Sequence, residues 1–281
     1  MNNIFNIRRF GLVLSKDFHE RWKKYGLQFL TMFGVMTVFF TWYAYDNGPE
    51  DFLRDNMRLL QLASFLFLGL GIFYASTLMD SMREKTKRIA YLTTPASHFE
   101  KFLSRWLIVT IGYTIAFFIA FWLADTIRVA FLSYKYPEFN IQFLNFDYLV
   151  KPEEVNNSRD YVFSDKGLFG LCIGLYFLLQ SLFILGATFW EKSSFIKTFS
   201  AGAVVVFSFL LLNYWMIKIV IHDMEGFEKA MDTLFLRSNI REEISENTAL
   251  LIMTCFLSFC ALLNWIIAFF RFRESEIIKR L

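Results

Sequence analysis

Six long apolar stretches dominate the hydrophobic pattern of this 281-residue chain. Each contains roughly 18–23 mostly apolar residues, enough for a helix to cross ~30 Å of hydrocarbon. Because every backbone polar group must be paired inside a membrane, such stretches predict helices. The expected fold class is therefore an all-α integral membrane protein, with a single transmembrane domain over residues 1–281. Its spans are expected at about 27–44, 59–79, 107–124, 168–189, 199–220 and 249–270.

A second hydrophobic pattern precedes the first span, over about residues 4–25. Apolar and aromatic side chains recur there at steps of three and four, and basic side chains occupy much of the remaining surface. This pattern predicts an amphipathic helix lying in the membrane interface, and a solvated N-terminal tail is the alternative. The recurring residues are Ile7, Phe10, Leu14, Phe18, Trp22 and Tyr25.

The link between the second and third spans contains a helix stop followed by a helix start. Residues 83–92 can continue a basic helix, but Pro95 disfavours helical geometry at Thr94 and ends it. A new helix can begin with Thr94 as cap and Pro95 at its first position, or with Ser97 as cap and Glu100 closing a capping box. Either start predicts a helix–turn–helix elbow at the membrane surface.

Two connecting segments on the other side have weaker patterns. Residues 141–149 mix apolar and polar side chains without a clean period, so a short strand and an interfacial helix both remain possible there. Residues 223–247 place apolar side chains at helical spacing among acids, which predicts a short amphipathic helix before the sixth span.

Charge separates the connecting segments into two groups. The basic group holds 18 Lys/Arg and 8 Asp/Glu, whereas the rest of the chain holds 11 Lys/Arg and 18 Asp/Glu. Because basic residues stay on the cytoplasmic side during insertion, both termini and the elbow are expected to be cytoplasmic, with the acidic loops external. The basic group comprises residues 1–26, 80–106, 190–198 and 271–281.

Composition and motifs argue against several other classes. With 56% hydrophobic residues, the chain has no room for a separate soluble domain. The basic residues form no run with interleaved aromatics, so we expect no nucleic-acid partner. His19, His98 and His222 are isolated and the cysteines form no CxxC pair, so we expect no metal site and no cofactor. No GxSxG elbow is present, and we expect neither catalytic residues nor an enzyme.

The polar residues inside the spans suggest how the protein is energised. Lys218 is the one ionisable side chain within them, which argues against an ion-coupled carrier. No GxxxxGK[ST] loop is present either, so a separate subunit must supply any ATP hydrolysis. Gln180, Asn213 and Asn264 are uncharged; they suit interhelical hydrogen bonds, and lining a translocation path is the alternative.

The stretch FYASTLMDSMREKTKRIAYLTTPASHFEKFLSRWL, residues 73–107, is similar to one found in permease-like proteins of Bacteroidetes. Over the whole chain, the order of interfacial helix, six spans and basic elbow resembles the membrane subunits of type-2, export-class ABC transporters. The resemblance implies a transport subunit in a bacterial inner membrane that forms a homodimer or heterodimer of permeases and binds two separate ABC ATPase subunits. In that family the link after span two carries a coupling helix, braced by the N-terminal helix.

Carried onto this chain, these roles fall to residues 83–101 and 4–25. Basic side chains of the elbow can orient an acidic groove of an ATPase while apolar ones provide contact. The same charges can instead anchor the span to anionic membrane lipid. The alternative function is a non-transporting membrane scaffold or sensory subunit with an envelope partner. The expected docking residues are Arg83, Lys85, Lys87, Arg88, Ile89, Tyr91, Leu92, Thr94, Pro95, Ser97 and Glu100.

Overall fold

The computed structural model describes residues 5–47, 52–82, 84–151, 161–190, 192–220 and 246–278. Six of its helices are long and apolar enough to cross a membrane, and the described residues form no β-strand. These observations confirm the predicted all-α membrane fold class. The amphipathic helix predicted within residues 223–247 lies outside the described residues, except for its last two positions.

Each predicted span lies largely within one long helix, although the second, 59–79, runs past the end of α2 at Ala75. The third predicted span lies across three consecutive elements, because α4 (His98–Leu107), a one-turn π-helix η2 (Ile108–Gly112) and α5 form one apolar helix, His98–Lys135. The long helices are α1 (Ile7–Asn47), α2 (Phe52–Ala75), α5 (Tyr113–Lys135), α6 (Lys166–Phe189), α7 (Ser194–Val220) and α10 (Glu246–Ile278).

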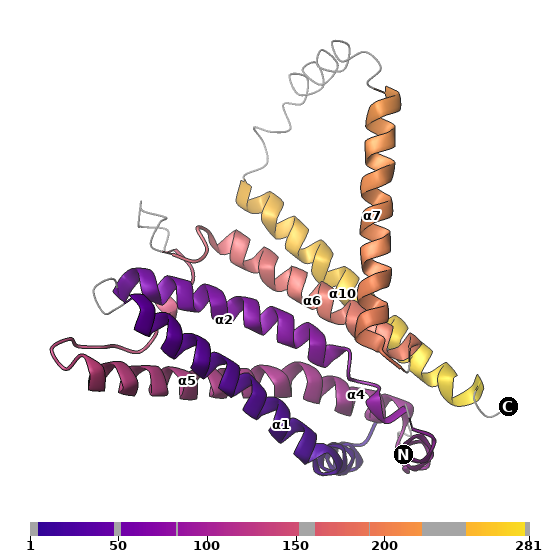
Figure 1. Cartoon of the computed structure of the whole chain (residues 1–281). Helices are drawn as coiled ribbons and strands as arrows, with labels where there is room; N and C mark the ends of the chain where they lie inside the picture. Colours follow the sequence, from indigo (N-terminus) through magenta and orange to yellow (C-terminus); the bar gives the residue numbers. More distant parts are fainter. Residues whose placement is uncertain are drawn as a thin grey trace.

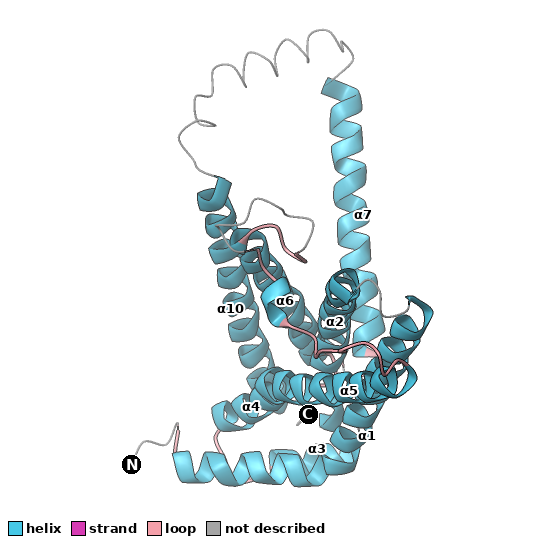
Figure 2. Ribbon diagram, turned by 90° about the vertical axis from the view of Figure 1, so that its left-hand side faces the viewer, coloured by secondary structure: helices cyan, strands magenta, loops and turns pink. Residues whose placement is uncertain are grey.

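The predicted interfacial helix and the first span belong to one continuous helix, α1. The direction of α1 changes along its length: its first part is drawn nearly end-on in Figure 1 and runs along the lower edge in Figure 2. Its two parts thus lie crosswise to one another. This is the shape that an interfacial segment followed by a span requires.

The predicted elbow is present between α2 and α5. After α2 the chain forms a short 3-10 turn, η1 (Asp80–Met82), then α3 (Lys85–Leu92), a turn around Pro95, and α4. α4 and the C-terminal part of α10 lie at the lower right of Figure 1, and the first part of α1 lies at its lower edge. We call this side the elbow end, and the opposite side, where residues 136–151 lie, the loop end.

The segment 141–149 forms neither of the two predicted structures. It is extended apart from a 3-10 turn, η3 (Phe146–Tyr148), and an isolated β-bridge joins Val150 to Phe163. Its position is set by a buried ion pair on α5. Asp125 Oδ2 accepts a hydrogen bond from Leu144 N at 2.8 Å, and Arg128 Nη2 donates to Gln142 O at 2.9 Å.

Two apolar clusters hold the long helices together. The first joins α1, α2 and α5 around the fully buried Met36 and Phe40. The second lies nearer the elbow end, where Tyr91 of α3 and Phe102 of α4 meet residues of α2, α6 and α10, including Phe272. In lipid such contacts stabilise through close packing, since lipid tails are as apolar as the side chains.

α6 and α10 pack side by side, whereas α7 diverges from the other helices (Figure 1). The α6–α10 contact is close because a Cβ placed on Gly174 would lie 3.4 Å from Thr254 O. A small residue at such a crossing lets the two helix backbones approach closely. α7 touches α6 near Gly186 and Thr198, and its apolar side chains are otherwise exposed, from Ile196 to Met216.

Candidate functional site

The start of α4 uses the second of the two predicted capping arrangements. The Ser97 side chain accepts a hydrogen bond from Glu100 N at 3.2 Å, and Ser97 N donates to Glu100 Oε2 at 3.0 Å. Thr94 does not cap α4: its hydroxyl donates back to Ala90 O in α3 at 3.1 Å. The turn at Pro95 therefore separates two complete helices.

Glu100 also reaches across to the beginning of α1. Asn6 N donates to Glu100 Oε1 at 2.7 Å, and Arg9 donates through Nε to Oε2 at 2.6 Å and through Nη2 to Oε1 at 2.9 Å. The Glu100 side chain is fully buried, whereas that of Arg9 is 37% exposed. A buried carboxylate requires such partners, since an unpaired buried charge costs several kcal/mol. Glu100 consequently joins the first turn of α4 to the first turn of α1.

Further polar contacts connect α1 to the elbow. Lys16 Nζ donates to Thr94 Oγ1 at 2.7 Å. Ser104 Oγ donates to Asp17 Oδ2 at 2.8 Å, and Arg105 Nε lies 4.0 Å from the same oxygen. Lys24 forms an ion pair with Asp80. We call Arg9, Lys16, Asp17 and Lys24 the α1 stripe. Arg9 and Lys24 each lie seven or eight residues, about two helical turns, from the adjacent pair Lys16 and Asp17, which places the four on one side of the helix.

Tyr91 holds α3 against α4 through buried contacts. Its ring lies under the Arg105 guanidinium, with the Cζ atom 3.4 Å from the ring centroid, and its hydroxyl donates to Lys101 O at 3.0 Å. Both side chains are buried, and a desolvated cation–π contact is worth roughly 2 kcal/mol. With the α1 stripe, these contacts make α3, α4 and the first part of α1 one packed unit.

The predicted docking residues divide into an outward and an inward group. Lys87, Ile89 and Pro95 are exposed, Arg88 and Thr94 are half-buried, and Tyr91, Ser97 and Glu100 take part in the internal contacts above. Arg83 lies outside the described residues, as do the side chains of Lys85 and Leu92. The exposed positions 86, 87, 89, 90 and 93 form what we call the α3 outer face.

The three polar residues inside the spans have separate environments. Asn264 Nδ2 of α10 donates to Ser181 Oγ of α6 at 3.0 Å, which is an interhelical hydrogen bond of the predicted kind. The side chain of Gln180 is fully buried, and its amide makes no hydrogen bond to any described residue. Asn213 donates to Phe209 O of its own helix at 2.7 Å. None of the three lines either cavity described below.

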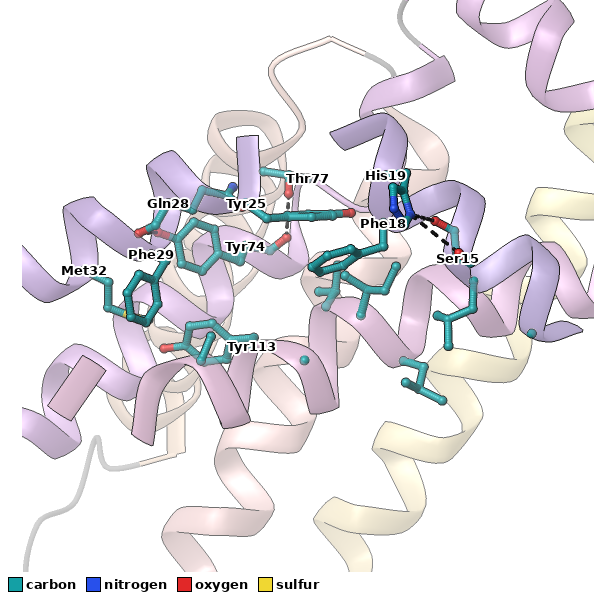
Figure 3. A pocket seen from close by; sticks show the side chains of 17 residues that line it. Ser15, Phe18, His19, Tyr25, Gln28, Phe29, Met32, Tyr74, Thr77 and Tyr113 are labelled. Carbon is teal, nitrogen blue, oxygen red and sulfur yellow. Dashed lines mark hydrogen bonds between the residues drawn. The ribbon is translucent and has the colours of Figure 1, made fainter. Parts of the chain in front are cut away.

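A cavity of about 470 Å³ lies where the two parts of α1 meet α2 and the π-turn (Figure 3). We call it the α1–α5 cavity. Four residues of α1 face Tyr74 of α2, Thr77 just after α2 and Tyr113 of α5 across it: Phe18, Tyr25, Phe29 and Met32. The rest of its wall comprises Gly11, Leu14, Ser15, His19, Gln28, Leu107, Ile108, Val109, Gly112 and Ala116.

A second cavity, of about 350 Å³, lies nearer the loop end between α2, α5 and α6. Phenylalanine makes up eight of its seventeen lining residues, and Phe146, Leu149 and Phe163 belong to the segments that follow and precede the spans. Ser64 and Thr114, two of its few polar residues, donate to their own helix backbones at 2.8 Å. Its wall is therefore almost entirely apolar.

No family model, curated protein or solved structure matches this chain. Function consequently rests on the residues and their geometry. Among the described residues, no group of three His, Cys, Asp or Glu side chains is placed to hold a metal ion.

Sequence patterns missed the long-range partners of the site. Arg9 and Glu100 are 91 residues apart, and Asp17 and Ser104 are 87 apart. A glutamate in a capping box is normally a surface residue, so nothing in the local sequence of Glu100 indicates a second partner. The spacing of Arg9, Lys16 and Lys24 along α1 was the available signal.

Proposed function

We propose that this chain is the membrane-spanning subunit of an ATP-driven ABC exporter and binds a separate ATPase through the α3 outer face. The proposal rests on one observation: the outer face of α3 is exposed and carries basic and apolar side chains, while its inner side packs against α4. Ile89 is 52% exposed and Lys87 is exposed at the other edge of the α3 outer face, while Tyr91 is buried under Arg105. A face that carries an apolar side chain and a cation suits a small, electrostatically oriented interface.

The packed unit of α3, α4 and the first part of α1 connects the α3 outer face to the spans. α4 continues through η2 into α5, and α3 follows α2 after a short turn, so movement of α3 acts on both spans. Glu100 and the α1 stripe tie the same unit to the first part of α1. An ATPase that rocks on α3 would therefore move three spans together, with the elbow acting as a lever on the cytoplasmic side.

The energy source follows from what the sequence lacks. The chain has no phosphate-binding loop, and the six predicted spans contain no acidic or basic residue except Lys218. Lys218 is exposed, and its Nζ lies 5.8 Å from the centroid of the Trp215 ring, an arrangement typical of the end of a span. An ATPase partner accounts for both absences.

Two substitutions on the α3 outer face test the docking surface. Lys87→Glu combined with Ile89→Asp should abolish co-purification of a chain carrying GxxxxGK[ST], and the ATP hydrolysis that accompanies it, from native membranes. Lys197→Glu is the matched control, because Lys197 is an exposed lysine of α7 at the elbow end. If the wild-type chain retains no such ATPase, or if the double variant retains it fully, the proposal is wrong. Equal losses in the control would indicate lipid anchoring by the charges instead.

A further inference from the structure

The α1–α5 cavity has a polar end and an apolar end. Ser15 and His19 lie at one end of the view in Figure 3, and Phe29 and Met32 lie at the other. Ser15 and His19 are exposed, whereas Met32 is 2% exposed. The cavity thus changes from wet and polar to dry and apolar along α1. An amphiphilic molecule with one polar headgroup and one hydrocarbon tail has the same sequence of a polar part followed by an apolar part.

Three hydroxyl groups between these ends already donate hydrogen bonds to backbone carbonyls. Tyr74 donates to Gln28 O at 3.3 Å, Tyr113 donates to Phe67 O at 2.7 Å, and Thr77 donates to Tyr74 O at 2.9 Å. The middle of the cavity consequently offers mostly ring and methylene surface to a ligand. A ligand with polar groups along its whole length would lose hydrogen bonds there, whereas a hydrocarbon tail would not.

The π-turn creates room on one wall. Gly112, its last residue, lacks a side chain, and a Cβ built there would lie 3.9 Å from its nearest neighbour, Ile108. Gly112 and Ile108 both line the cavity. The total of about 470 Å³ is enough for roughly 15 non-hydrogen atoms at ~30 Å³ each, which is the size of one acyl tail.

The polar end lies beside a basic surface. Between residues 15 and 24, α1 carries Lys16, Arg21, Lys23 and Lys24 against Asp17 and Glu20, with His19 among them. Lys16 also approaches Glu20 at 3.5 Å and Lys24 pairs with Asp80, so the local charge is partly neutralised. The remaining excess favours an anionic headgroup at the membrane interface.

We propose that the α1–α5 cavity binds an anionic membrane lipid, with one acyl tail between α1 and the π-turn and its headgroup beside Ser15 and His19. This site does not depend on the proposed ATPase. A lipid held there contacts both parts of α1 and the junction of α4 with α5, so its presence sets how the interfacial part of α1 lies against the spans.

Filling the cavity tests the proposal directly. The full-length chain is reconstituted in vesicles containing phosphatidylglycerol with a diazirine in its acyl tail, illuminated, and mapped by mass spectrometry. We expect adducts on peptides containing Phe29, Met32 and Ala116 in the wild type. Ala116→Phe should reduce these adducts roughly tenfold or more, because the tail then has no room.

The matched control is Ala130→Phe, the same change at an exposed position of α5 outside the cavity. It should leave the adducts unchanged, and adducts on the exposed residues of α7 should persist in every variant, which shows that the protein is inserted. Gly112→Leu, which enters the cavity from the π-turn, is the second filling variant. Unchanged cavity adducts in both filling variants would overturn the tail site.

Changing the photoreactive probe tests which headgroup the site prefers and whether its occupant is a phospholipid or a free fatty acid. The same diazirine tail on phosphatidylcholine should give several-fold fewer cavity adducts, and equal labelling by the two lipids would refute the anionic headgroup. A diazirine fatty acid without a glycerol headgroup distinguishes a free carboxylate from a phospholipid. Fatty-acid labelling that outcompetes phosphatidylglycerol would reject a phospholipid as the occupant.

Discussion

Glu100 closes the capping box of α4 and, with the same carboxylate, accepts two hydrogen bonds from the Arg9 guanidinium of α1. One side chain thus serves local helix formation and a contact across 91 positions of sequence. Because the carboxylate is fully buried, neither task can be lost without leaving the other partners unsatisfied. This relationship connects the elbow to the first part of α1, and the proposed lever depends on it.

Removing the charge of Glu100 should destabilise the protein. We expect Glu100→Gln to lower the free energy of unfolding by about 2–3 kcal/mol, less than the ~3–5 kcal/mol of a fully buried pair because Arg9 is 37% exposed. Thermal unfolding of the detergent-solubilised protein measures the change. In a double-mutant cycle with Arg9→Met, the two losses should be less than additive; full additivity would show that the two residues do not interact.

An exposed pair nearby provides the comparison. Lys87 Nζ lies 3.0 Å from Glu84 Oε1, and both side chains are more than 60% exposed. Glu84→Gln should therefore change stability by less than ~1 kcal/mol in the same assay. A larger loss would indicate that α3 contributes to the packed unit through its outer face, contrary to its proposed role as a docking surface.

Losing the cap of α4 should have an intermediate effect. Ser97→Ala removes the hydroxyl that accepts from Glu100 N and should cost about 1 kcal/mol. Ser97→Asp retains an acceptor but places a second carboxylate beside Glu100, so only Ser97→Thr should restore wild-type stability. Thermal unfolding of the three variants checks this order of stabilities. A Ser97→Ala protein as stable as the wild type would contradict the capping role.

The buried pair at the loop end should hold the segment 142–144. Asp125→Asn weakens both the 2.6 Å contact with Arg128 and the hydrogen bond from Leu144 N, so this segment should become more accessible to protease. Limited proteolysis followed by mass spectrometry measures the cleavage rate. Asp147→Asn, which changes an exposed carboxylate of the same segment, is the control. Equal cleavage of both variants would mean that Asp125 does not position the segment.

The charge asymmetry predicts which face of the membrane each end occupies. After replacement of Cys172, Cys255 and Cys260, a cysteine at Lys87 should react with an impermeant thiol reagent only after the membrane is opened, whereas one at Glu138 should react in intact cells. Both positions are exposed in the folded chain. Labelling of position 87 in intact cells would invert the proposed topology.

Sequence periodicity was sufficient for the elements that depend on local chemistry. The length of the apolar stretches predicted all six spans, and Ser97 with Glu100 predicted the capping box, because both features arise within a few residues of one another. The joining of α1 into one helix was not predicted, since Gly26 can end a helix or continue it.

The remaining features depend on contacts between distant segments. Neither the burial of Tyr91 under Arg105 nor the two cavities can be inferred from a hydrophobic pattern, because the pattern distinguishes lipid from water and not lipid from protein. Residues 141–149 likewise depend on distant partners. Their sequence has no clear period, and hydrogen bonds from Arg128 and to Asp125 determine their course.

The most direct test of the docking account is a photo-crosslink from the α3 outer face. A photoreactive benzoylphenylalanine at Ile89, 52% exposed, is compared in native membranes with one at Ile196 of α7, 65% exposed at the same end of the protein. The account predicts that position 89 cross-links to a chain containing GxxxxGK[ST], that position 196 does not, and that Lys87→Glu removes the cross-link. Cross-links from position 89 to lipid alone, with no such chain attached, would contradict it.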